Sequence, residues 1–134
     1  MSTSERYLLE IVSPGGIARA VLVRHLAPIT ADRFYARLPM SGMAIRQAPG
    51  VFVFVEMEAE PEKAVRKMSR GDVGFVASRS AVIIALEDWS GYLIITPLGR
   101  VEEGLETLEQ VKTGDTISFR KVVGDDVLEA PRGK

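Results

Sequence analysis

The chain has 134 residues, of which 46% are hydrophobic and 26% are charged, with 17 basic and 18 acidic side chains. This length is typical of one domain that can bury a substantial core, and a chain without cysteine forms no disulfide. The near-zero net charge provides no bulk attraction to nucleic acid or to an anionic membrane, and no apolar run is long enough to span a bilayer. We therefore expect a cytoplasmic globular domain over residues 1–123, followed by a flexible C-terminal tail over residues 124–134.

The first predicted element is a β-hairpin. Residues 7–12 are apolar and β-branched, and they run into Ser13-Pro14-Gly15-Gly16, which is a strong turn signal. Residues 17–25 then interleave apolar side chains with arginines, as a strand does.

A helix is expected next, over residues 30–38. Phe34 and Leu38 lie one helical turn apart, and the proline that follows ends the element. Thr30 is the predicted N-cap, and Ile29 and Phe34 are predicted to pack together as a hydrophobic staple.

The middle of the chain favours a second pair of strands, over residues 43–47 and 51–59. Residues 51–59 alternate cleanly, which predicts a strand with one buried face. That face would carry Val51, Val53, Val55, Met57 and Ala59, and the other face Phe52, Phe54, Glu56, Glu58 and Glu60. Residues 61–68 are interpreted as one or two helical turns that begin at Pro61.

The remaining elements are mostly strands. The apolar run 81–86 indicates a strand buried on both faces, whereas Val101, Leu105 and Leu108 have the spacing of an amphipathic helix. Further strands are expected over 73–77, 92–96 and 116–123. This count predicts a mainly β fold, a closed β-barrel of about eight strands capped by two short α-helices.

Two segments resemble the cyclophilins. Residues 98–106 (LGRVEEGLE) are similar to the signature in which a strand leads through Glu-Gly into the second capping helix, and residues 27–34 (APITADRF) resemble the entry into the first helix. The run 71–75 (GDVGF) and the short length are closer to the small prokaryotic and archaeal cyclophilin-like proteins, trimmed barrels without an established biochemical activity. The resemblance implies a cyclophilin-like barrel, but function depends on the site rather than on the fold.

The resemblance also implies a place for a prolyl isomerase site. Isomerases need an apolar groove for the proline ring and a cationic donor near the amide, because twisting makes the amide nitrogen a better acceptor. Arg46, which precedes Pro49-Gly50, matches the position of the family's arginine, although Ala44-Ile45 replaces the usual Phe-His. The alternative is an arginine at a strand end whose stem covers apolar surface.

The groove itself would be formed by apolar and aromatic residues. Phe54 stands where the family has a glutamine, Ile83 or Ile84 falls near a groove phenylalanine, and Trp89 lies close to a groove tryptophan. Phe52 is the remaining candidate, and packing of the barrel is the alternative reading for both phenylalanines. Loss of the glutamine favours altered or absent isomerase activity.

Other chemistry has weaker support. His25 is the only histidine, so neither a histidine metal cluster nor a Ser-His-Asp triad is predicted, and we expect no cofactor. The stripe Glu56, Glu58 and Glu60 could hold a hard cation or act as an acid and base, but such a stripe is typical of a solvated surface.

We therefore expect a protein that binds a peptide or small ligand in an apolar groove, with weak peptidyl-prolyl isomerase activity centred on Arg46 as one outcome. The alternative is a non-enzymatic interaction module or homo-oligomer that uses an exposed aromatic patch. Neither reading includes a nucleic-acid or membrane partner.

Overall fold

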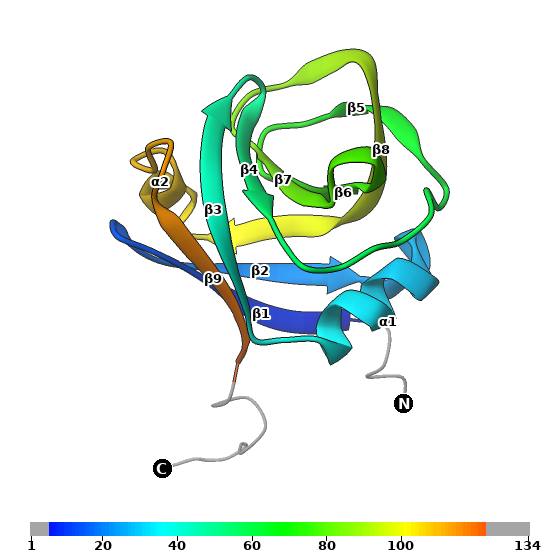
Figure 1. Cartoon of the computed structure of the whole chain (residues 1–134), viewed down its shortest axis with the longest axis horizontal. Helices are drawn as coiled ribbons and strands as arrows, with labels where there is room; N and C mark the ends of the chain where they lie inside the picture. Colours follow the sequence, from blue (N-terminus) through cyan, green and yellow to red (C-terminus); the bar gives the residue numbers. More distant parts are fainter. Residues whose placement is uncertain (1–5, 123–134) are drawn as a thin grey trace.

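The computed structural model describes residues 6–122, and the β-strands of this range form one antiparallel sheet (Figure 1). They are β1 (Arg6–Ser13), β2 (Gly16–Val23), β3 (Met40–Gln47), β4 (Gly50–Phe54), β5 (Val65–Met68), β6 (Asp72–Val76), β7 (Ala81–Ala85), β8 (Trp89–Glu103) and β9 (Thr116–Lys121). The order is β2-β1-β9-β3-β4-β7-β6-β8-β5, and a further pairing between β2 and β8 closes eight of these strands into a barrel. The predicted fold class is confirmed, whereas the predicted tail lies outside the described residues.

Short helices cover the two ends of the barrel (Figure 1). α1 (Pro28–Ala36) follows the 3-10 turn η2 (Arg24–Leu26), α2 (Leu105–Leu108) precedes β9, and a second 3-10 turn η3 (Ala77–Arg79) joins β6 to β7. Phe34 of α1 and Leu108 of α2 are both fully buried in the interior cluster. Of the described helices, none is long and apolar enough to cross a membrane.

The second helix is shorter than the sequence pattern predicted. Val101 was expected to begin it, but this residue pairs with Ala20 of β2 inside the long strand β8. Ladder hydrogen bonds along β8 therefore override the helical spacing of Val101, Leu105 and Leu108. The helix begins only after Gly104, whose φ of 82° suits glycine.

The barrel wall formed by β4, β7 and β6 is buried on both faces. Val51 and Val53 of β4 point into the interior cluster, whereas Phe52, between them, belongs to a second cluster on the outside of the wall. This outer cluster also contains Met68 of β5 and Ile95 of β8, so these two strands lie over the wall. The buried face predicted for residues 51–59 is confirmed, since it lies in or against the interior cluster. The prediction for the other face was wrong at Phe52 and Phe54, because alternation cannot show that another layer covers it. The prediction for 81–86 is confirmed, since all of β7 is buried.

The predicted helical turns over residues 61–68 were also wrong. Residues 65–68 form β5, which pairs with the first half of β8 through Val65–Ile95 and Met68–Trp89. The predicted strand 51–59 ends at Phe54, and the chain from 55 to 64 crosses irregularly from β4 to β5.

Closure of the barrel depends on a close approach at Gly99 of β8. Gly99 pairs with Leu22 of β2 and with Val73 of β6, and a Cβ atom there would lie 1.9 Å from the carbonyl oxygen of Val21. A backbone oxygen cannot move away without breaking the ladder. Glycine is therefore required where β2 and β8 meet.

We predict that Gly99→Ala lowers the free energy of unfolding by more than about 3 kcal/mol, or prevents folding, because the seam must open. Chemical denaturation followed by circular dichroism measures this loss. Gly15→Ala is the matched control, since its added Cβ would meet its nearest neighbour at 3.2 Å. Equal stability of the two variants would contradict the proposed role of the seam.

Candidate functional site

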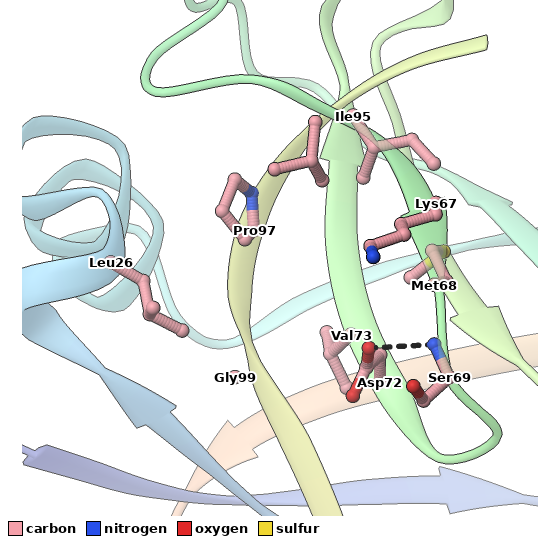
Figure 2. Close-up of a pocket in the computed structure, with 10 residues that line it drawn as sticks. Leu26, Lys67, Met68, Ser69, Asp72, Val73, Ile95, Pro97 and Gly99 are labelled. Carbon is pink, nitrogen blue, oxygen red and sulfur yellow. Dashed lines mark hydrogen bonds between the residues drawn. The ribbon is translucent and has the colours of Figure 1, made fainter. Parts of the chain in front are cut away.

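A mainly apolar pocket of about 300 Å³ opens between β5, β6, β8 and η2 (Figure 2). Four elements contribute to its wall, and most of the side chains are aliphatic. The lining residues are Leu26, Val65, Lys67, Met68, Ser69, Asp72, Val73, Ile95, Pro97 and Gly99. Met68 and Ile95 also belong to the outer cluster, so the pocket is backed by packed apolar side chains.

The pocket exists because β5 and β6 do not pair, although only a short turn joins them. β6 pairs with β7 on one edge and with the second half of β8 on the other, so neither edge is free for β5. β5 instead pairs with the first half of β8. The turn is held by Ser69, whose N–H donates to Asp72 Oδ2 at 2.8 Å, while the Asp72 N–H donates to the Ser69 carbonyl at 2.9 Å.

Two charged side chains lie in this apolar wall. The Asp72 carboxylate is engaged by the turn. Lys67 is exposed at the rim and extends from β5 toward β6 (Figure 2). In the described part of the chain, the Lys67 ammonium has neither a hydrogen-bond acceptor nor an ion-pair partner. The pocket therefore combines apolar walls with one cation at the rim.

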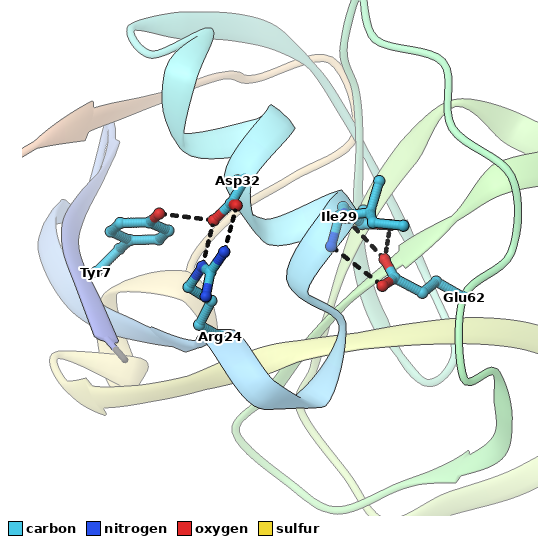
Figure 3. A network of polar contacts seen from close by, with 6 residues as sticks. Tyr7, Arg24, Ile29, Asp32 and Glu62 are labelled. Carbon is cyan, nitrogen blue, oxygen red and sulfur yellow. Dashed lines mark hydrogen bonds and ion pairs between the residues drawn. The ribbon is translucent and has the colours of Figure 1, made fainter. Parts of the chain in front are cut away.

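Glu62 fixes the segment that leads into β5 (Figure 3). Its carboxylate accepts the N–H groups of Ile29 at 3.0 Å and Thr30 at 2.7 Å, and the Thr30 hydroxyl at 2.7 Å. The Glu62 N–H donates to the buried Thr96 hydroxyl of β8 at 3.0 Å. Burial raises the pKa of Glu62, but the hydrogen bonds from Thr30 and Ile29 outweigh burial, and the pKa lies below its ordinary value.

The prediction of what caps the first helix was therefore wrong. α1 begins at Pro28, Ala27 is its N-cap, and no side chain of the cap residue bonds to the helix. Thr30 lies inside the first turn, and a carboxylate 32 residues away satisfies the free amides. Ile29 is 66% exposed while Phe34 is buried, so the two do not form a staple.

A second polar contact fixes the other side of α1 (Figure 3). Arg24 forms a bidentate pair with Asp32, with Nε–Oδ1 at 2.7 Å and Nη2–Oδ2 at 2.8 Å, and the Tyr7 hydroxyl donates to Asp32 Oδ1 at 2.6 Å. The hydrogen bond from Arg24, together with that from Tyr7, lowers the pKa of Asp32 to about 2. Because Leu26 lies between Arg24 and α1, both contacts help to position this wall of the pocket.

Arg46 lies on a different part of the barrel. Its Nη1 donates to the carbonyl oxygens of Glu109 at 2.9 Å and Val111 at 3.0 Å, just after α2. It borders a separate, more polar cavity of about 360 Å³, whose other lining residues are Gln47, Ala48, Pro49, Gly50, Leu86, Glu87 and Glu109. Arg46 is thus beside a hollow, but its guanidinium is partly engaged by backbone carbonyls.

The structure brings the four predicted groove residues together, but not with Arg46. Phe52 and Ile83 are a cross-strand pair in the outer cluster, and Phe54 and Trp89 pack against the same cluster. Arg46 pairs with Val51, whose side chain points into the barrel, so Arg46 lies on the opposite face of the sheet from Phe52. The Arg79 guanidinium lies 5.0 Å from the Phe52 ring centroid and covers it further.

The remaining candidates lie at the surface. Glu56, Glu58 and Glu60 are exposed and follow β4 in an irregular segment. Arg33 of α1 donates to the Glu58 carbonyl, and the C-cap residue Arg37 donates to that of Glu56. His25 is exposed in η2. Among the described residues, no group of three or more His, Cys, Asp or Glu side chains could hold a metal ion.

Sequence reasoning missed the residues that line the pocket. Val65, Lys67 and Met68 fall in the segment interpreted as helical, and Pro97 falls inside a strand. Val65 and Met68 are three residues apart, a spacing that fits a helix as well as an irregular strand. Pairing with β8 decides between the two, and this pairing leaves no local signal.

We predict that Glu62→Ala lowers the free energy of unfolding by about 1 kcal/mol at neutral pH, because the α1 amides lose their acceptor. The folded pKa of Glu62 is lowered, so its stabilisation is complete above the usual value of 4.5 and is lost as the pH falls through the folded value. The difference from wild type should therefore shrink below that pH. Urea titrations at several pH values test this, with Glu60→Ala as an exposed control, and a constant difference would contradict it.

Comparison with known proteins shows a relationship of fold. No family model matches the chain, and none of the curated proteins matches it. Nine chains of solved structures match. One is the solution structure of the hypothetical protein AF2241 from Archaeoglobus fulgidus, with a TM-score of 0.73 and 18% identity over 91% of this chain and 100% of that chain. At this identity the likeness concerns the fold alone.

Proposed function

We propose that this protein is a cyclophilin-like barrel that binds a small ligand, or an apolar side chain of a peptide, in the pocket between β5, β6, β8 and η2. The observation that supports this most directly is the wall of that pocket. Aliphatic side chains from four elements converge on it, and the two charged groups lie among them. Burial of an apolar group against such a wall removes water from both surfaces and drives binding.

The proposed relation to cyclophilin-like proteins has two supports. The barrel has a helix over each end, and the two motif segments lie at corresponding places (Figure 1). Residues 27–34 enter α1, and residues 98–106 run from the end of β8 into α2. The pocket is not the predicted groove, although it shares Met68 and Ile95 with the cluster that contains the predicted groove residues.

We predict that Val65→Trp weakens binding of the neutral fluorophore N-phenyl-1-naphthylamine by roughly ten-fold, since the indole would fill the pocket mouth. Val65 is 38% exposed and lines the pocket, so the larger ring can be accommodated with little disturbance of the core. A fluorescence titration measures the affinity.

Ile94→Trp is the matched control for this experiment. Ile94 lies beside the pocket residue Ile95, is 45% exposed and does not line the pocket. Binding by the control should equal that of wild type. The proposal fails if the fluorophore does not bind wild type saturably, or if both tryptophan variants bind it as wild type does.

Prolyl isomerase activity would have to use the cavity beside Arg46 and Pro49, and the contacts there weigh against it. A catalytic guanidinium must reach the substrate amide, and here Nη1 already donates to two carbonyls. The other guanidinium nitrogens would have to supply the donor. The cavity wall also carries Glu87 and Glu109, which suit a proline ring less well than an apolar groove does.

We predict that Arg46→Ala lowers the melting temperature by roughly 5 °C, because the two carbonyls after α2 lose their donor. A protease-coupled assay on a proline peptide should show equal rates for wild type and variant, both at the uncatalysed level. Catalysis by wild type that disappears in a folded Arg46→Ala variant would instead establish the isomerase. Gln47→Ala, beside it in the same cavity, is the control for stability.

A further inference from the structure

We infer that the ligand of the apolar pocket is a small amphiphilic anion, whose apolar body lies against Val65, Met68 and Ile95 and whose carboxylate or sulfonate group is bound by Lys67. This inference rests on the proposed function and specifies the ligand class. The two charged groups of the pocket differ, because one is engaged by the protein and the other is not.

Asp72 is the engaged group. Its Oδ2 accepts the Ser69 N–H at 2.8 Å, and its own N–H donates back to the Ser69 carbonyl. The carboxylate therefore stabilises the turn between β5 and β6. This role accounts for an acidic residue at the end of an otherwise apolar wall without any ligand.

Lys67 is the group that the fold does not use. It lines the pocket, and within the range 6–122 its ammonium has neither an ion-pair partner nor a hydrogen-bond acceptor. Figure 2 shows its side chain extending from β5 toward β6, above Met68 and Val73. An ammonium at the rim of an apolar wall can remain hydrated while it binds an anion whose apolar part is buried.

The neighbouring cation shows that this placement is specific. Arg66 precedes Lys67 on β5 but does not line the pocket, and its Nη1 lies 3.4 Å from the Tyr92 carbonyl oxygen. β5 is irregular between Val65 and Lys67, and of these two neighbouring cations only Lys67 lines the pocket. Arg66 carries the same charge and is the adjacent residue, so it serves as an internal control.

The size of the pocket favours a small molecule over a peptide. A cavity of about 300 Å³ is at the lower limit of those that enclose small ligands. β8 and η2 border it on the side away from β5, so an extended chain would have to leave the hollow after a single side chain. An apolar acid of about ten carbons could instead place most of its surface inside.

A pair of fluorophores that differ by one sulfonate group tests the inference. 8-Anilinonaphthalene-1-sulfonate is N-phenyl-1-naphthylamine with one sulfonate added. We expect Lys67→Gln to weaken binding of the sulfonate by roughly ten-fold and to leave binding of the neutral compound within about two-fold of wild type. Arg66→Gln should change neither affinity by more than about two-fold. Decanoate should displace the sulfonate from wild type at lower concentration than decan-1-ol does.

The outcomes separate this inference from the proposed function. Failure of the neutral compound to bind, or its insensitivity to Val65→Trp, overturns the pocket itself. If the neutral compound binds there but Lys67→Gln leaves the sulfonate affinity unchanged, only the anion is overturned. Equal losses in Lys67→Gln and Arg66→Gln would show a general charge effect and also overturn it. So would stronger displacement by decan-1-ol, or displacement by a short acidic, apolar peptide at lower concentration than decanoate. Lys67 is exposed, and thermal melting should show that its variant folds as wild type does.

Discussion

The pairing of β8 with three other strands is the constraint on which the structure depends. The second half of β8 pairs with β2 on one edge and with β6 on the other, and so closes the barrel. Its first half leaves the barrel wall and pairs with β5. Because β6 has no free edge, β5 must stand apart from it, and the gap between them is the pocket. Closure of the barrel and formation of the pocket thus both follow from the way β8 pairs.

The layer formed by β5 and the first half of β8 also explains why the outer face of the β4, β7 and β6 wall is buried. Met68, Ile95 and Leu93 pack over Phe52 and Ile83, so apolar area that would face water on an isolated barrel becomes a second core. Glu62 holds the other margin of this layer, because it bonds at once to the first turn of α1 and to Thr96 of β8. The apolar packing on one side and the Glu62 hydrogen bonds to α1 on the other keep β5 in place.

Local patterns were sufficient for much of the barrel. The Pro-Gly-Gly turn and the alternating strands around it predicted the first hairpin, and the uninterrupted apolar run predicted that β7 is buried on both faces. The same rules failed where a partner distant in sequence decides the outcome. Val101 has helical spacing to Leu105 but lies in a ladder with Ala20, and residues 65–68 become a strand only through β8. The candidate site divided in the same way. Phe52, Phe54, Ile83 and Trp89 lie in or against one cluster, whereas Arg46 lies on the other face of the sheet.

The sequence alone determined a mainly β barrel with two short helices, its principal strands and most of the residues inside it, because periodicity and turn residues act over a few neighbours. Only the tertiary structure decided what covers the outside of the wall, where Arg46 donates its hydrogen bonds, and which carboxylate caps α1. Arg46 and Glu109 are 63 residues apart, and Glu62 and Thr30 are 32 apart. Contacts at such separations leave no period in the sequence. The pocket and its unpaired lysine belong to this second group, because they arise from two strands that adjoin in the chain and yet do not pair.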